Sequence, residues 1–122
     1  AKIDKQIAKI EAECDEAIES DERMRDISRR FQEVKCVGPC LTRAVLACCP
    51  DIGEFNEKSI AKMCGEAPID HESCTIKKKA RPKRGRPDLK KALYMSAISG
   101  SRNNHILRGI YQRLIANGKL KK

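Results

Sequence analysis

A serine beside a strongly basic tract is the residue best suited to chemistry in this chain. The stretch HESCTIKKKARPKRGR, residues 71–86, places Ser73 four positions before the first of seven basic side chains. A serine hydroxyl attacks an electrophile only when a base or a metal removes its proton and cations stabilise the developing charge. The tract could provide such cations for a phosphate. The alternative reading is an ordinary loop serine next to a solvated run of charge.

Several basic side chains on and after this tract are candidates for contact with phosphates. They are Lys77, Lys78, Lys79, Arg81, Lys83, Arg84, Arg86, Lys90, Lys91 and Arg102. His71 and Glu72 flank Ser73 and could orient it, but no Ser/His/Asp triad is readable within the chain.

The charge of the chain is distributed very unevenly. The net charge is +9 over all 122 residues, and residues 76–122 alone carry 15 basic and 1 acidic side chains. Such a region holds a strong positive potential and favours a polyphosphate partner, DNA or RNA. No apolar run is long enough to cross a bilayer, so we expect no membrane partner.

The seven cysteines predict neither a disulfide framework nor a zinc site. Their number is odd and no CxxC pair is present. Cys64, His71 and Cys74 follow spacings of seven and three, which match no common zinc pattern. We expect reduced cysteines packed in the core and no metal site in this chain.

Residues 1–33 are expected to form coiled-coil or dimerisation helices. Ile3, Ile7, Ile10, Cys14 and Ala17 alternate at spacings of four and three, which is the a/d pattern of a coiled coil. The pattern predicts a homo-oligomer, a dimer or tetramer, assembled through the N-terminal helix. A helix that packs against its own domain fits the same spacing equally well.

Residues 34–49 resemble a helix-hairpin-helix, in which a tight turn presents backbone N–H groups to a phosphate. After the helix predicted at 22–33, a short apolar loop closes on Gly38–Pro39, and we expect Val37 and Gly38 to contact nucleic acid. The usual motif has a glycine where this chain has Cys36.

The rest of the chain predicts a mainly α-helical fold. A short helix at 58–65 ended by glycine precedes a serine loop at 66–85, which is expected to be a small β-hairpin or an extended basic loop. Two basic helices follow within 86–118, interrupted at Gly100 and Asn103–Asn104. Their apolar residues are expected in the core: Leu93, Tyr94, Met95, Ile110 and Leu114.

Five ordered blocks give the chain a family resemblance. They are CVGPCLTRAVL, IAKMCGEAP, HES, KRGRPDLKKALYM and YQRLIANGK. Together they resemble the C-terminal domain of insertion-sequence transposases related to the Piv and MooV invertases, the bridge-RNA-guided recombinases. The resemblance covers residues 34–119, and residues 34–122 would form the domain. Cys74 stands where the family has a glycine, and the segment from Ser73 to Lys83 is about two residues shorter by comparison.

The resemblance implies a function and partners for the chain. Ser73 would be the nucleophile that attacks a DNA phosphate, with DNA and a structured guide RNA as partners. A RuvC-like domain with an acidic Mg²⁺ site would precede this chain in the family, so no cofactor is expected within residues 1–122. The family runs on past GKLKK, which suggests a truncated copy. The expected location is the bacterial cytoplasm, associated with the nucleoid.

Three functional readings follow. The favoured one is the DNA-binding and strand-joining domain of a transposase. The alternatives are a non-catalytic helix-hairpin-helix binding module, and a coiled-coil protein whose basic half binds an acidic partner. Because a complete acid and metal set is missing, the isolated chain is expected to bind DNA without cutting it.

Overall fold

The computed structural model describes residues 1–66, 69–73, 76–81 and 85–120 of the chain, with side chains described for 1–66 and 85–120. These residues form helices and one two-stranded sheet, which confirms the mainly α-helical class. The elements are α1 (Lys2–Ser20), α2 (Glu22–Glu33), α3 (Pro39–Cys48), α4 (Glu57–Met63), β1 (Ile69–Ser73), β2 (Ile76–Arg81), α5 (Pro87–Asn103) and α6 (His105–Ala116).

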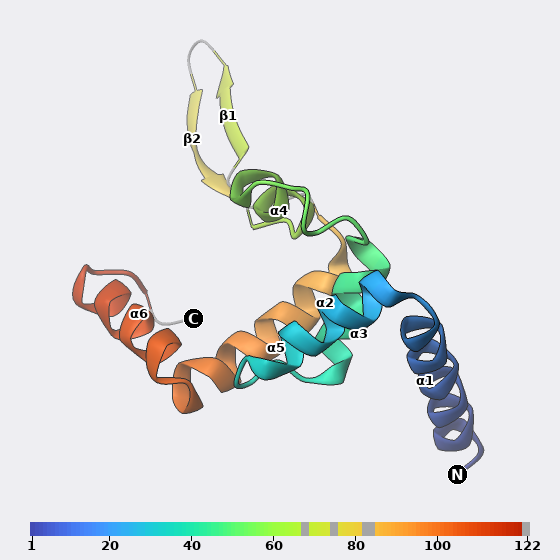
Figure 1. The fold of residues 1–122 in the computed structure, drawn as a ribbon. Helices are drawn as coiled ribbons and strands as arrows, with labels where there is room; N and C mark the ends of the chain where they lie inside the picture. Colours follow the sequence, from blue (N-terminus) through green and yellow to red (C-terminus); the bar gives the residue numbers. More distant parts are fainter. Residues whose placement is uncertain (67–68, 74–75, 82–84, 121–122) are drawn as a thin grey trace.

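The hydrophobic core lies where α2, α3 and α5 meet (Figure 1). Leu41 and Val45 are one turn apart on α3 and pack with Cys49 and the fully buried Leu89 of α5. Phe31 of α2 packs against this cluster. Aliphatic side chains and one buried thiol therefore fill the core, as the near absence of aromatic residues predicts.

Helix α1 leaves the core at a sharp joint. Asp21 has extended backbone angles between α1 and α2, and its carboxylate accepts the Met24 N–H at 3.0 Å as the N-cap of α2. No residue of α1 is buried, and Ile3, Ile7 and Ile10 are 50–68% exposed. The rest of the described chain thus leaves the predicted a/d stripe uncovered, and the coiled coil stays a prediction.

A second joint separates α5 from α6. The buried Asn104 accepts the N–H groups of Ile106 and Leu107 and donates to the carbonyl oxygen of Lys35 at 3.2 Å. The extended backbone of Asn104 ends α5, its side chain caps the start of α6, and its bond to Lys35 fixes the corner against the α2–α3 connection. The break predicted at Gly100 is wrong, because Gly100 is buried inside α5, where the side chain of Leu107 packs against it.

A projecting arm consists of α4 and the strands β1 and β2, and Figure 1 shows the strands extending away from α3 and α5. Helix α4 ends at Met63 and is followed by Gly65 in the left-handed conformation (φ +72), where the Gly65 and Glu66 N–H groups donate to the carbonyls of Lys62 and Ala61. The strands pair antiparallel, with Ile69 opposite Arg81 and a register shift between Ile69 and His71.

Several apolar residues expected in the core are on the surface. Tyr94, Met95, Ile110 and Leu114 are 41–60% exposed, and only Leu93 packs against the core cluster. For Tyr94 and Met95 the expectation fails because they lie on a part of α5 that no described element covers. For Ile110 and Leu114 it fails because α6 contacts the rest of the described chain mainly through α5. A helix with one packing partner buries only one narrow face.

Candidate nucleic-acid interface

Ser73 is the last residue of β1, at the far end of the arm (Figure 1). Its Cα partner across the sheet is Ile76 of β2, and its neighbours Glu72 and His71 are opposite Lys77 and Lys78. The backbone pairing therefore places the predicted nucleophile alongside the start of the basic strand. Cys74 lies outside the described residues.

The predicted basic residues divide between the arm and α5. Lys77, Lys78, Lys79 and Arg81 all belong to β2, whereas Lys83 and Arg84 lie outside the described residues. Arg86 is the exposed N-cap residue of α5, and Lys91 and Arg102 are exposed further along that helix. The fold thus presents positive charge on a strand and on a helix that begins a few residues after it.

Two glycines, Gly65 and Gly85, allow a close approach of two backbone segments at the base of the arm. Gly85 has a φ of +125°, and a Cβ added there would lie 2.8 Å from the Cys64 carbonyl carbon and still closer to the backbone of Gly65. Only glycine allows this approach of two backbones. The contact joins a glycine just after α4 to the glycine before the N-cap of α5, so both ends of the strand pair start from one point.

Lys90 reinforces this base instead of standing free on the surface. Its Nζ donates to the carbonyl oxygen of Gly65 at 3.3 Å and lies 3.9 Å from the Glu66 carboxylate. These two contacts help to position the arm, and they keep the positive charge of Lys90 near the end of α4. Sequence reasoning assigned Lys90 to nucleic acid alone, and no local pattern indicates the contact with Gly65.

The α2–α3 connection is the segment for which the sequence predicts a helix-hairpin-helix turn. Cys36 adopts a φ of +77°, the left-handed conformation that glycine prefers, at the position where the usual motif has glycine. The Val37 N–H bonds to the Val34 carbonyl at 3.1 Å, and the Val37 side chain packs on the core. Gly38 caps α3, and a Cβ there would meet nothing within 4 Å. Of the two predicted contact residues, Gly38 has open space beside it, whereas the backbone N–H of Val37 already donates a hydrogen bond within the chain.

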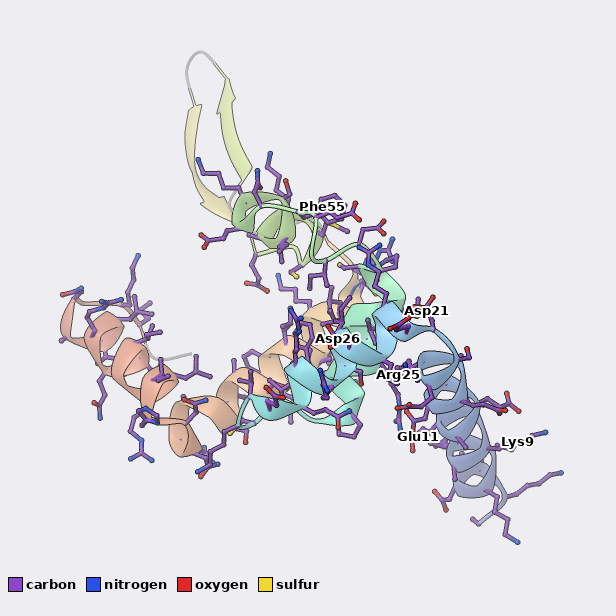
Figure 2. The ribbon with its side chains drawn as sticks, in the orientation of Figure 1. Lys9, Glu11, Asp21, Arg25, Asp26 and Phe55 are labelled. Carbon is purple, nitrogen blue, oxygen red and sulfur yellow. The ribbon has the colours of Figure 1, made fainter. Side chains whose placement is uncertain are left out.

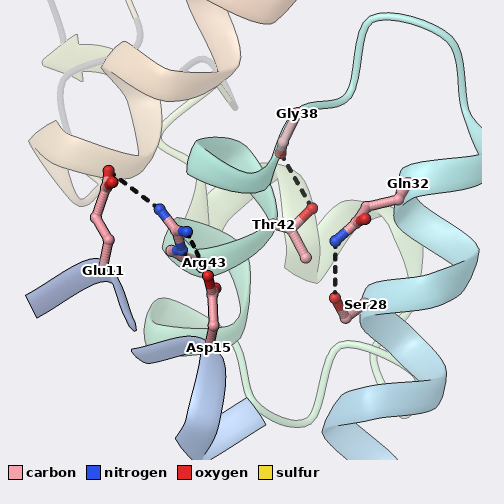
Figure 3. A network of polar contacts seen from close by, with 7 residues as sticks. All are labelled: Glu11, Asp15, Ser28, Gln32, Gly38, Thr42 and Arg43. Atoms are coloured by element: carbon pink, nitrogen blue, oxygen red, sulfur yellow. Dashed lines mark hydrogen bonds and ion pairs between the residues drawn. The ribbon is translucent and has the colours of Figure 1, made fainter. Parts of the chain in front are cut away.

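Arg43 is a positioning residue that sequence reasoning missed. Its guanidinium donates to both carboxylate oxygens of Asp15 at 2.8 and 2.7 Å and lies 3.1 Å from Glu11, which joins α3 to α1 (Figure 3). Figure 2 shows Glu11 on the side of α1 toward the core and Lys9 on the opposite side. These hydrogen bonds lower the pKa of Asp15 and raise that of Arg43. The available signal was a lone charge in the apolar run LTRAVLACC.

The described cysteines have no disulfide partners, but the expectation that they pack in the core is only partly right. Cys49 is buried and Cys48 and Cys64 pack against the core, whereas Cys14 and Cys40 are exposed. Burial raises the pKa of Cys49 and of Cys64, which disfavours the reactive thiolate form of both. Among the described side chains, no group of three His, Cys, Asp or Glu residues is arranged to hold a metal ion. His71 and Cys74, two of the three residues weighed for zinc, fall outside that part of the chain.

None of the described helices combines the length and the apolar character needed to span a bilayer.

No curated protein matches the chain. A family model described as the transposase IS116/IS110/IS902 family matches residues 28–112, which include α3, the arm, α5 and most of α6. The match covers more than half of the 122 residues and contains Ser73 and all of the predicted contact residues. The chain therefore belongs to the IS116/IS110/IS902 transposase family.

Proposed function

We propose that this chain is the DNA-binding C-terminal domain of a transposase and that Ser73 is the nucleophile for DNA strand cleavage and joining. Membership of the transposase family supports a DNA partner. The observation that carries the proposal is the position of Ser73 at the end of a projecting strand, with Lys77 and Lys78 on the paired strand. A phosphodiester could reach such a position without entering the helical core.

The proposed step is a phosphoryl transfer to serine. The Ser73 Oγ attacks the phosphorus, an Oγ–P bond forms, and one P–O bond to deoxyribose breaks. The hydroxyl proton passes to a base, and the released deoxyribose oxygen takes up a proton. Attack by that deoxyribose hydroxyl or another strand end reverses the step and joins the strands. Cations of β2 would stabilise the extra negative charge at phosphorus.

A metal ion is implied by the family resemblance, but the described residues do not fit one. Their acidic, histidine and cysteine side chains form no ligand group of three. We therefore derive no step through a metal from this chain. In the proposal, the base that activates Ser73 comes from a RuvC-like domain or from another subunit.

The proposal extends to the partners. A structured guide RNA would occupy part of the basic surface, and the uncovered Ile3, Ile7 and Ile10 stripe of α1 would pair subunits in a dimer or tetramer. The relation to the Piv and MooV invertases belongs to the same proposal. Residues 1–33 would then serve assembly and residues 34–122 would serve DNA.

The test is a covalent trap with a transposase in which this chain follows its RuvC-like domain. Wild type, Ser73→Ala and the control Ser96→Ala on α5 are incubated with nicked cognate DNA and resolved on a denaturing gel. We expect a protein–DNA adduct with wild type and with the control, and none with Ser73→Ala. The mass of the modified peptide should locate the phosphate on Ser73.

An adduct of undiminished yield in Ser73→Ala would contradict the nucleophilic role. The isolated chain provides a second check, because it should bind DNA without cleaving it. Cleavage by the pure chain would refute the requirement for an outside base.

A non-catalytic binding module is the second candidate. The absence of a three-residue acidic or metal group among the described side chains favours it, as does the open space beside Gly38 at the start of α3. Under this reading, wild type forms no adduct, and Ser73→Ala binds DNA as wild type does.

A further inference from the structure

The outer face of α5 carries apolar residues that the core does not use. Tyr94 and Met95 are 54% and 60% exposed, although α5 packs Leu89, Ala92 and Leu93 into or against the core. An exposed aromatic ring beside an exposed Met is costly in water, so the pair is a candidate contact surface. No described element of the chain covers it.

Basic residues lie at both ends of this apolar pair. Lys91 and Arg102 are exposed, and they share with Tyr94, Met95 and Ile98 the spacings that bring side chains onto one helix face. At 1.5 Å per residue, Lys91 and Arg102 are about 16 Å apart along α5. Neither takes part in an ion pair with any described residue. Arg108 donates to the carbonyl oxygen of Arg102 and adds its charge at the α5–α6 corner.

Exposed cations beside an exposed aromatic ring favour one form of nucleic acid over another as the partner. Cations alone suit the phosphates of a duplex, whose bases are stacked inside and leave an aromatic side chain without a role. A single strand offers both phosphates and the faces of unpaired bases, which stack on aromatic side chains. Residues 85–120 carry seven basic and one acidic side chains, which disfavours a basic or neutral protein surface as the partner.

We propose that the α5 face formed by Lys91, Tyr94, Met95 and Arg102 binds single-stranded DNA, with one unpaired base stacked on the Tyr94 ring. This inference rests on the proposed function, since it identifies the form of DNA held by the domain. The 16 Å span corresponds to roughly five phosphates at the strand spacing of B-form DNA. An oligothymidylate of about twelve nucleotides therefore covers the face.

The experiment uses the fact that the chain contains no tryptophan. Tyr94→Trp places a single fluorophore at the stacking position, and Ile106→Trp places one at a 61% exposed position on α6 as a control. Oligothymidylate should quench the fluorescence of Tyr94→Trp and leave that of Ile106→Trp nearly unchanged. A blunt duplex should quench neither.

Affinity measurements with labelled oligonucleotides complete the test. Tyr94→Ala should raise the single-strand Kd by roughly 5- to 150-fold, the range expected for loss of one stacked base. Tyr94→Phe, which keeps the ring, should stay within about twofold of wild type, and duplex affinity should change little in either variant. Circular dichroism establishes that each variant is folded.

The remaining outcomes distinguish failure of the stacking inference from failure of the proposed function. If Tyr94→Ala binds single strands as wild type does, or if Tyr94→Trp is not quenched on binding, the stacking role is refuted while the proposed DNA-binding function stands. If the wild-type chain binds neither single strands nor duplex, the proposed function itself fails. If the chain self-associates without DNA and Tyr94→Ala abolishes the association, the face pairs two copies of the chain and the inference is overturned.

Discussion

The helical core and the projecting arm are held by different forces. In the core, Leu41, Val45 and Leu89 are at most 5% exposed and pack across α3 and α5. The arm joins the core through two facing glycines, the hydrogen bond from Lys90 to Gly65, and Met63 of α4, which packs against the core cluster. Core stability is therefore spread over many apolar contacts, whereas the placement of β1 and β2 depends on a few contacts at the base of the arm.

This difference separates stability from the proposed chemistry. The residues that keep the domain folded are on α3 and α5, and the predicted nucleophile is at the end of β1. A substitution in the core should affect every measurement together. A substitution at the base of the arm should affect the arm first.

The largest expected effect is at the centre of the core. Leu89→Ala removes a side chain with no exposed surface and should lower the free energy of unfolding by about 2–5 kcal/mol. Chemical denaturation monitored by circular dichroism measures the change. Met95→Ala on the outer face of the same helix is the control and should stay within about 0.5 kcal/mol of wild type. Equal losses in the free energy of unfolding for the two variants would contradict the assignment of one buried and one exposed face to α5.

The next effect is at the base of the arm. Gly85→Ala places a Cβ against the backbone of Gly65 in a conformation that costs a non-glycine residue about 1–3 kcal/mol. We expect faster amide exchange across β1 and β2 with little change in α3, as measured by hydrogen exchange. Gly53→Ala is the matched control, since a Cβ there meets nothing within 4 Å. A uniform increase in exchange through α3 would show that arm and core unfold together.

A smaller effect is expected at the left-handed residue of the α2–α3 connection. Cys36→Gly should raise the free energy of unfolding by about 0.5–1 kcal/mol, because glycine adopts a φ of +77° without the Cβ clash. Cys36→Val should lower it, because a β-branched residue is strained there. Thermal and urea denaturation of the two variants give the comparison. Lower stability in the glycine variant than in wild type would contradict this account.

The smallest effect concerns α1, which no buried contact holds. Arg43 lowers the pKa of Asp15 in the folded chain, so the ion pair stabilises the packing of α1 above the unfolded pKa of about 4. That contribution is lost as pH falls through the lowered pKa. A carboxyl-carbon NMR titration should show Asp15 returning to an ordinary pKa in Arg43→Met. The core should unfold at an unchanged temperature, because the Asp15 side chain is 55% exposed.

Local signals predicted much of the helical framework. Asp21 caps α2, Pro87 opens α5, and Gly65 and Gly118 occupy left-handed positions after α4 and α6, as cap chemistry indicates. These features depend on neighbours within a few residues, so the sequence alone contains them.

Contacts between distant segments were not predictable in the same way. Arg43 meets Asp15 across 28 positions, and Asn104 meets the carbonyl of Lys35 across 69. Helical periodicity also placed Tyr94 in the core, because spacing identifies an apolar face without showing whether another element covers it. For the candidate site, sequence resemblance indicated Ser73 and the basic residues, and the described fold added their division between β2 and α5.

The facing glycines at the base of the arm also govern how insertions and deletions act. Because both ends of the segment between Gly65 and Gly85 meet at one point, a change in its length need not disturb α3 or α5. Removing one residue from each strand would draw the end of β1 about 3.3 Å toward the core. The length of the arm would therefore set the distance of Ser73 from the core independently of α3 and α5.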